Sequence, residues 1–262
     1  MVTGAGRGMG REIARRLAGR GYAVLVTDVN AEAAEDTAAL IGEAARSMAQ
    51  DVRDPNSHRA VAAAAAERGP IKVWVNNAGI LRTQRAWVHP DEEVRAIVDA
   101  NLLGVIWGSR AAVESMRSAG GGHIINMASM SSFGPVPGLA VYGATKHAVL
   151  GFTASLQGDL SEEGIPIRVH AVCPDGVDTG MVRERQGEPD SAIIFSAPRL
   201  LQPEEVAARA VALIDGTRIV EAIPRWRAWV VRLSAPFPRA NLRMAAAFRK
   251  MGERKRRKEA AG

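Results

Sequence analysis

Short apolar, β-branched runs alternate with Ala- and Arg-rich helical stretches along most of this chain. The predicted strands are 23–28, 46–50, 73–76, 123–127, 167–172 and 219–223. The predicted helices between them are 10–20, 31–42, 55–68, 92–118, 140–163 and 203–215. Several strands are apolar almost throughout, as parallel strands covered on both faces are. Alternation at this interval predicts an α/β fold with a doubly wound parallel sheet in a single domain.

A glycine-rich turn occupies the start of the chain, between a short apolar run and the first predicted helix. Glycines let a pyrophosphate approach the backbone without Cβ clashes, and the helix N-terminus faces the anion with free N–H groups. The spacing is Gly-x-x-x-Gly-x-Gly, which is not the usual Gly-x-Gly-x-x-Gly pattern. Such a turn alone is compatible with a structural role, but its position favours a dinucleotide site. Its candidate cofactor-binding residues are Thr3, Gly4, Arg7, Gly8, Met9 and Gly10.

Acidic residues near the ends of two predicted strands indicate which dinucleotide binds. Asp28 can accept hydrogen bonds from ribose hydroxyls and repels a 2′-phosphate, which favours NAD over NADP. Arg7 is evidence in the other direction, since a base in the turn could meet a 2′-phosphate. We give Asp28 more weight because no basic residue follows it directly. Asp51 and Val52 follow the next strand, where an acid could take the adenine amino group.

Tyr142 and Lys146 lie four residues apart on a predicted helix and therefore share one face. An ammonium close to a phenol favours the phenolate and lowers the tyrosine pKa, so Tyr142 is a candidate acid and base. Chance pairs at this spacing are common, and the pair gains force only from its setting. The Asn-Asn-Ala-Gly segment 76–79 ends another predicted strand with small residues that suit close approach to a ligand.

Together these motifs resemble the short-chain dehydrogenase/reductase family, in its single-domain form with Tyr-x-x-x-Lys. The resemblance covers nearly everything from Val2 to about Pro224. It rests on the order and intervals of Thr3-Gly4-x-x-x-Gly8-x-Gly10, Asp51, Asn76-Asn77-Ala78-Gly79, Asn101, Ser129 and Tyr142-x-x-x-Lys146. It implies a Rossmann-like catalytic domain over 1–224, followed by an extension over 225–262.

The resemblance implies roles for four catalytic residues. Tyr142 would donate a proton to a carbonyl oxygen in reduction, or accept one from an alcohol in oxidation. Lys146 would lower the Tyr142 pKa and hydrogen-bond the nicotinamide ribose. Ser129 would hold the substrate oxygen, and Asn101 would anchor a water that links Lys146 to solvent. A packed hydroxyl for Ser129 and an ordinary helix amide for Asn101 stay open as alternatives. The implied cofactor contacts beyond the glycine turn are Asp28, Asp51, Val52, Asn77, Ala78, Gly79, Tyr142, Lys146, Pro174, Val177 and Thr179.

Two departures from the family pattern lie in the predicted domain. The chain reaches Thr3 after only Met1 and Val2, whereas the family has a full strand before this turn. We expect a truncated first strand, or an assigned start that is too late, with buried ladder groups unpaired at about 1–3 kcal/mol each. Asp175 stands where the family has Gly, in the segment 173–179 that covers the nicotinamide amide. A carboxylate there would favour the positively charged oxidised ring.

A third departure is the segment 225–262, which runs past the family core. It holds twelve basic and two acidic residues, a balance of +10, whereas the rest of the chain carries −4. Apolar side chains are interspersed among them: Trp226, Trp229, Val230, Val231, Leu233, Phe237 and Phe248. This pattern could dock on an anionic membrane surface, but we favour a helical extension packed on the body or on a partner subunit. Nucleic-acid binding is not expected, because only the tail is basic.

The remaining composition fits a cytoplasmic protein. The 262 residues suit one large α/β domain, and no apolar run approaches the ~20 residues that span a bilayer. The N-terminus has no signal-peptide pattern. Cys173 is the only cysteine, which excludes an intrachain disulfide and fits a reducing compartment. The histidines are scattered without ligand-like spacing, so we expect no metal site.

We therefore expect an NAD-dependent oxidoreductase that interconverts a secondary alcohol and a ketone, and that forms a homodimer or homotetramer. The alternatives are an NADP-dependent 3-oxoacyl-carrier-protein-type reductase and a non-catalytic NAD-binding regulatory protein on the same fold. The irregular segment 180–202 is typical of a mobile substrate lid. Apolar residues in and near it predict an apolar substrate: Leu139, Met181, Val182, Ile193, Ile194, Phe195 and Leu200.

Overall fold

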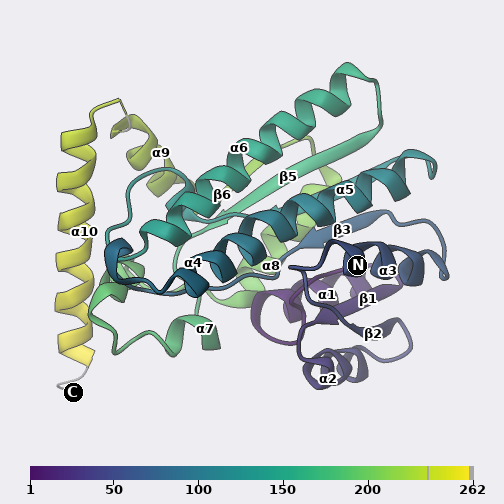
Figure 1. Ribbon diagram of the computed structural model, residues 1–262, viewed down its shortest axis with the longest axis horizontal. Coiled ribbons are helices and arrows are strands. Elements are labelled where there is room, and N and C mark those ends of the chain that lie inside the picture. Colours follow the sequence, from purple (N-terminus) through teal and green to yellow (C-terminus); the bar gives the residue numbers. More distant parts are fainter. Residues whose placement is uncertain (235, 260–262) are drawn as a thin grey trace.

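The computed structural model describes residues 1–234 and 236–259, with side chains through Arg257. It contains a parallel sheet covered by helices on both faces (Figure 1). The strands are β1 (Val24–Asp28), β2 (Ala45–Ala49), β3 (Val73–Asn76), β4 (Gly122–Met127), β5 (Ile167–Pro174) and β6 (Val220–Ile223). β1 pairs with β2, and β3 to β6 pair in sequence order, always in parallel. The predicted doubly wound α/β fold is confirmed.

Val2 joins the two halves of the sheet at its centre. It forms parallel bridges with Val26 of β1 and with Val75 of β3, so the first strand is reduced to one bridged residue. The Met1 ammonium donates a hydrogen bond to the Val73 carbonyl at 2.7 Å. Burial lowers the pKa of this amine to about 5. The few residues of this strand thus pair with both neighbouring strands.

Helices cover the two faces of the sheet in separate groups. One face carries α1 (Gly8–Gly19), α2 (Ala31–Ile41) and α8 (Pro203–Ala212), and the other carries α3 (Pro55–Ala66), α5 (Gly104–Arg117) and α6 (Ala140–Glu162). Buried apolar side chains of the strands pack against both groups. Short 3₁₀ helices connect the elements: η1 (Ala86–Val88), η3 (Met130–Ser132), η4 (Pro189–Ser196) and η5 (Leu213–Asp215).

The long helix predicted over 92–118 is interrupted. It consists of α4 (Asp91–Val98), a π-helical turn η2 (Asp99–Leu103) and α5. The continuous stretch Asp91–Arg117 has the length and composition of a membrane span. Half of its most apolar part is buried inside the protein, however, as in a core helix. A π turn widens the helix locally and is frequent at functional sites.

The C-terminal extension forms α9 (Arg225–Ser234) and α10 (Pro238–Glu259). Figure 1 shows α10, in yellow, standing along one side of the domain, and it contacts η4 closely. The close approach depends on Gly252, because a Cβ there would overlap the Ala192 carbonyl oxygen. Arg249 of α10 pairs with Asp190 at 3.2 Å. Residues 235 and 260–262 of the predicted extension lie outside the described residues.

The segment 180–202 is more ordered than the predicted irregular lid. It contains α7 (Gly180–Arg183) and η4, and α10 covers η4 from outside. The sequence pattern did not reveal this, because only the fold brings a helix some fifty residues downstream against the segment.

Candidate active site

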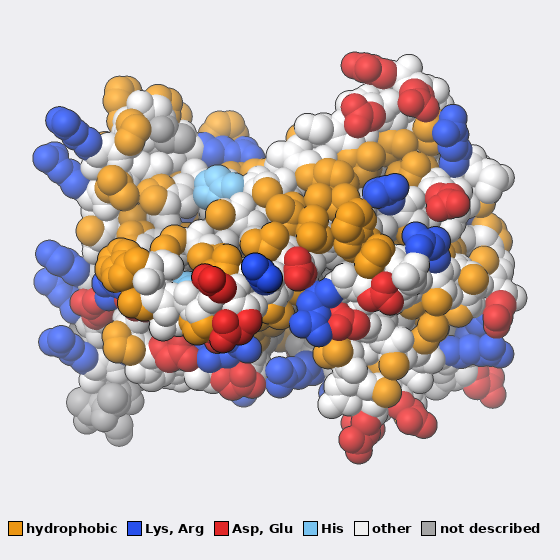
Figure 2. All heavy atoms as spheres, viewed as in Figure 1, with side chains coloured by type: hydrophobic (Ala, Val, Ile, Leu, Met, Phe, Trp, Pro, Cys, Tyr) orange, Lys and Arg blue, Asp and Glu red, His pale blue; other side chains and the backbone are white. Residues whose placement is uncertain are grey.

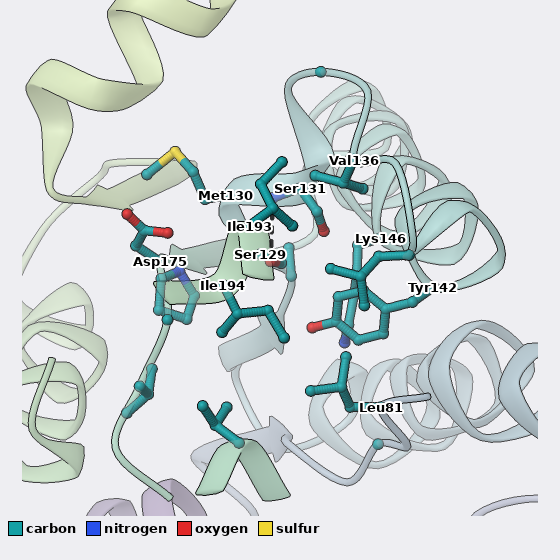
Figure 3. A pocket seen from close by; sticks show the side chains of 18 of the residues that line it. Leu81, Ser129, Met130, Ser131, Val136, Tyr142, Lys146, Asp175, Ile193 and Ile194 are labelled. Carbon is teal, nitrogen blue, oxygen red and sulfur yellow. Dashed lines mark hydrogen bonds between the residues drawn. The ribbon is translucent and has the colours of Figure 1, made fainter. Parts of the chain in front are cut away.

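Ser129, Tyr142 and Lys146 come together at the carboxyl end of the sheet (Figure 3). Ser129 follows β4 and begins η3, where its Oγ accepts a hydrogen bond from the Ser131 amide at 3.1 Å. Tyr142 and Lys146 occupy successive turns at the start of α6, and Lys146 Nζ lies 5.7 Å from the Tyr142 ring centroid. Ser132 Oγ donates to the Lys146 carbonyl at 2.7 Å, which ties η3 to α6. The cap that Ser129 makes on η3 and the four-residue spacing on α6 therefore fix where these three side chains lie.

The structure corrects the expected pKa of Tyr142. Burial raises this pKa to about 12, and a hydrogen bond with Ser129 acts in the opposite direction. Burial also lowers the pKa of Lys146 to about 8. The Lys146 ammonium donates to the Met127 carbonyl at 2.7 Å instead of meeting the phenol oxygen. Sequence spacing predicted a shared face, but desolvation determines the direction of the shift.

Asn101 lies in the π turn behind this group. Its side chain is fully buried, with Oδ1 accepting from the Ile80 amide at 2.6 Å and Nδ2 donating to the Ile80 carbonyl at 2.8 Å. A Cβ on Gly79 would lie 2.9 Å from Asn101 Oδ1 and 3.9 Å from Lys146 Nζ. The Asn101 side chain thus holds the loop after β3 beside Lys146, and its role as a water anchor stays a prediction.

The glycine turn forms a cradle at the N-terminus of α1. Gly4 has φ of +59°, and a Cβ there would lie 2.6 Å from the Ala78 Cα, while a Cβ on Gly10 would overlap the Gly4 carbonyl. Asn77 Nδ2 donates to the Gly4 carbonyl at 2.8 Å, and Asn77 Oδ1 is buried without a partner among the described residues. The side chain of Arg7, the N-cap residue of α1, makes no capping hydrogen bond with the described residues. Close backbone approach and an uncapped helix N-terminus fit the pyrophosphate of a dinucleotide, whereas the Asn77 Oδ1 acceptor suits a donor such as a ribose hydroxyl.

Asp28 and Arg7 flank this cradle. Asp28 Oδ2 accepts a hydrogen bond from the Gly6 amide at 2.9 Å, so the carboxylate lies against the turn. Arg7 pairs with Glu184, directly after α7, at 3.4 Å. The Asp28 carboxylate therefore lies against the glycine turn, whereas the Arg7 guanidinium is paired with the Glu184 carboxylate.

The other predicted cofactor-binding residues lie around the same edge. Asp51 forms an ion pair with Arg53 at 2.6 Å, and hydrogen bonds from this guanidinium hold the Asp51 pKa below its usual value. Val52 is buried, and a Cβ on Gly104 would lie 3.0 Å from its carbonyl oxygen. Residues from the end of β5 and the segment after it line the pocket: Pro174, Val177 and Thr179.

The pocket beside Tyr142 is largely apolar. Of the side chains predicted to surround the substrate, Leu139, Met181, Val182, Ile193 and Ile194 line it. Figure 3 shows Leu81, Val136 and the two isoleucines around the Tyr142 ring. Phe195 and Leu200 do not line the pocket but belong to the adjoining apolar cluster.

The extension closes this pocket, which sequence reasoning missed. Side chains of α9 and α10 line it: Arg227, Val231, Asn241, Met244, Ala245 and Phe248. The only signal in the sequence was the helical spacing of the α10 residues, which marks a packed face without saying what it packs against.

Asp175, which stands where the family has Gly, lines the pocket and forms an ion pair. Its carboxylate pairs with Arg227 of α9 at 2.8 Å, and the two side chains are 9% and 5% exposed. Arg227 also donates to Ser196 Oγ, and its Cζ lies 4.4 Å from the Phe248 ring centroid. The charge of Asp175 is therefore paired with the extension, and the effect of this carboxylate on the cofactor ring stays a prediction.

Comparison with known proteins agrees with this geometry. A family model described as short chain dehydrogenase matches residues 1–190. The chain belongs to the short-chain dehydrogenase family. A cyclohexanol dehydrogenase from Acinetobacter sp. is 34% identical over 82% of this chain and 86% of its own length. A 3-oxoacyl-[acyl-carrier-protein] reductase from Vibrio cholerae is 34% identical over 82% and 88%.

Solved structures of short-chain dehydrogenases share the fold. A 3-ketoacyl-(acyl-carrier-protein) reductase from Brucella melitensis, complexed with NADH, is 31% identical and superposes with a TM-score of 0.77. The match covers 84% of this chain and 94% of that one. This short-chain dehydrogenase is thus an oxidoreductase that acts on CH–OH or keto groups with NAD(P).

Proposed function

We propose that this short-chain dehydrogenase uses NAD to interconvert an apolar secondary alcohol and its ketone, with Tyr142 as the acid and base. The observation that carries this proposal is the convergence of Tyr142, Ser129 and Lys146 on one apolar pocket next to the dinucleotide cradle. A bound nicotinamide would accept or supply the hydride. The protein has to hold the substrate, exclude water and move one proton.

Three side chains divide this task. The Tyr142 hydroxyl donates its proton to a ketone oxygen or takes one from an alcohol. Ser129 holds that oxygen, as its interaction with the Tyr142 hydroxyl supports. Burial lowers the pKa of Lys146 to about 8, so this side chain can exchange a proton near neutral pH and return one to the Tyr142 hydroxyl. Asn101 keeps the loop beside Lys146 in place through Ile80.

The position of Asp28 supports NAD over NADP. Its carboxylate contacts the glycine turn, where it can bind ribose hydroxyls and would repel a 2′-phosphate. Arg7 is the base available to a phosphate in the turn, and it is paired with Glu184. The reductase alternative is favoured by two relatives whose names include acyl-carrier-protein reduction, and it predicts NADPH-dependent turnover of acyl-carrier substrates.

The test is NADH production from a panel of secondary alcohols that includes cyclohexanol. Tyr142→Phe should lower kcat by about 10²–10⁴-fold, because only the hydroxyl that moves the proton is removed. Tyr22→Phe is a matched control, since Tyr22 is the other tyrosine and lies on the far side of the sheet beside α1. Full activity of Tyr142→Phe would contradict the assignment. Absence of turnover with tight NAD binding would favour the non-catalytic alternative.

Self-association is supported by an apolar face on the outside of α4, η2 and α6. Val94, Val98, Leu102, Val141 and Ala144 form a shallow depression there. Figure 2 shows hydrophobic side chains gathered across the middle of this view. We propose a homodimer or homotetramer that buries this face. Light scattering on the purified enzyme, with Val141→Lys as the disrupting variant, tests it.

A peripheral membrane contact is supported by the outer face of α9. Trp226, Trp229, Val230 and Leu233 follow helical spacing and are all exposed, Trp229 by 62% and Leu233 by 71%. Figure 2 shows hydrophobic side chains at the upper left, with Lys and Arg along the adjoining edge. Apolar side chains beside a strongly basic segment fit an anionic bilayer surface better than a second copy, whose like charge would repel it.

We therefore propose a cytoplasmic enzyme that touches anionic lipid surfaces through α9. Vesicles of phosphatidylglycerol should co-sediment the protein, and vesicles of phosphatidylcholine should not. The double variant Trp226→Ser/Trp229→Ser should lose binding while its NADH production stays unchanged. Equal binding to both vesicle types would contradict an electrostatic contribution.

A further inference from the structure

Four residues that line the pocket carry a buried polar atom with no hydrogen-bond partner among the described residues. Asn77 Oδ1 lies at the dinucleotide cradle and Asp175 Oδ2 is ion-paired with Arg227, which leaves two such atoms beside the substrate. They are Oδ1 of Asn241, on α10, and Oγ of Ser131, on η3. Both residues line the pocket, and they are 6% and 7% exposed. Buried side-chain oxygens are nearly always hydrogen-bonded, so each unpaired one calls for an explanation.

The two residues are held in place by contacts that leave these atoms free. The Ser131 amide donates to Ser129 Oγ, which fixes its backbone but not its hydroxyl. Asn241 lies beside Gly134, where a Cβ would come within 3.2 Å of Oδ1 and 2.5 Å of a Val231 methyl. The absence of a side chain at Gly134 lets the extension approach the loop after η3. The amide is therefore positioned by the fold and not by a partner.

The surroundings of these atoms are apolar. Apolar side chains of the same pocket wall include Val136, Val231, Met244 and Phe248; none carries a donor, and only the Met244 thioether is a weak acceptor. The groups proposed to act on the reacting oxygen are Tyr142 and Ser129, which line the same pocket. Asn241 and Ser131 thus each add an unpaired polar atom to a largely apolar pocket wall.

We propose that Asn241 and Ser131 bind a hydroxyl on the substrate that is not the one oxidised. A ligand hydroxyl can donate to Asn241 Oδ1 or accept from the Ser131 hydroxyl, and either contact satisfies an orphan atom. The substrate class is then an apolar alcohol or ketone with a second hydroxyl, such as a diol or hydroxyketone. This inference rests on the proposed function, because it concerns the same pocket.

Equilibrium binding tests the proposal without turnover. With NADH present, alcohols cannot be oxidised, so their dissociation constants can be measured by titration calorimetry. The probes are cycloalkanols and straight-chain secondary alcohols, each paired with a diol that has one further hydroxyl at varied distance. For the best-matched pair, the enzyme should bind the diol about tenfold or more tightly than the mono-alcohol, because a site built for a hydroxyl rejects the analogue that lacks it.

Variants assign the preference to these two atoms. Asn241→Leu keeps the size of the side chain and should remove the preference for the diol, with equal or tighter binding of the mono-alcohol. Ser131→Ala should reduce the preference in the same way, and its smaller change protects the test if Asn241→Leu misfolds. Met244→Leu alters an apolar wall residue and should change the affinity for both members of a pair alike.

The possible outcomes separate this inference from the proposed function. A diol preference that survives in both Asn241→Leu and Ser131→Ala overturns the inference, as does no preference in any pair. NADH production from mono-alcohols that Tyr142→Phe abolishes tests the proposed function independently. A diol preference lost in the variants supports the inference even where turnover is slow.

Discussion

Replacing Arg227 with Met should destabilise the protein by about 3–5 kcal/mol, because it leaves a buried carboxylate without its partner. Asp175 and Arg227 are 2.8 Å apart and almost completely buried, so solvent screens neither charge well. Ser196 Oγ also loses a donor, which adds about 1 kcal/mol. Met keeps the aliphatic bulk of Arg beside Phe248, and the loss therefore reports mainly on charge.

Urea denaturation followed by circular dichroism measures this loss. The double variant Asp175→Asn/Arg227→Met removes both charges and should recover most of it, which gives a coupling energy of at least about 1.5 kcal/mol. The single variant Asp175→Asn should also destabilise, since it leaves the guanidinium buried and unpaired. Losses that simply add in the double variant, or a single-variant loss below about 1 kcal/mol, would refute the reasoning.

The pH dependence has a definite sign. Burial raises the pKa of Asp175 above its usual value, and Arg227 opposes that shift. Removing Arg227 raises the pKa further, so the destabilisation is largest at neutral pH, where the carboxyl of the unfolded chain is ionised. As the pH falls through the raised pKa, the folded protein takes up the proton and the penalty is relieved. The stability gap between wild type and Arg227→Met should therefore narrow in acid.

Three further predictions concern separate parts of the molecule. Asp28→Ala should raise the NADP/NAD ratio of kcat/KM by about tenfold or more, because a 2′-phosphate no longer meets a carboxylate; an unchanged ratio would mean that Asp28 does not select the cofactor. Gly252→Ala should push α10 off the Ala192 carbonyl, cost about 1–3 kcal/mol in urea and raise KM for alcohols with little change in NAD affinity. Burial and the neighbouring His170 lower the pKa of His123 to about 4 from 6.5. The stability of the folded protein should fall as the pH drops from 6.5 to about 4, because the unfolded chain binds the proton more readily. In a pH series of thermal midpoints, His123→Gln should make this decline smaller. An identical decline in both proteins would exclude His123 as its source.

Much of the fold could be predicted from local patterns. Each apolar β-branched run forms a strand of the parallel sheet, and each predicted helix is present. Strands buried on both faces are apolar throughout and amphipathic helices repeat apolar residues at helical spacing, so both patterns can be recognised in the sequence. The break in 92–118 was not predicted, because the extra residue of a π turn changes neither composition nor periodicity appreciably. The resemblance of the ordered motifs to one family was confirmed by the family match.

For the candidate site, the sequence identified the residues but not their electrostatic surroundings. The sequence named Ser129, Tyr142 and Lys146, and the structure brings them to one pocket, since strand-end and helix positions follow from residue order. It could not show that burial raises the Tyr142 pKa, because desolvation depends on what the whole fold places around the phenol.

The extension shows most clearly what only the tertiary structure decided. By itself the sequence determined a basic, partly apolar helical tail and an unusual Asp175. The fold turned that tail back over the pocket, paired Arg227 with Asp175 and placed Asn241 among the substrate-facing side chains. Charge, propensity and period are properties of residues in order and can be read along the chain. Burial and pairing are properties of residues that meet in space, so they appear only when distant segments come together.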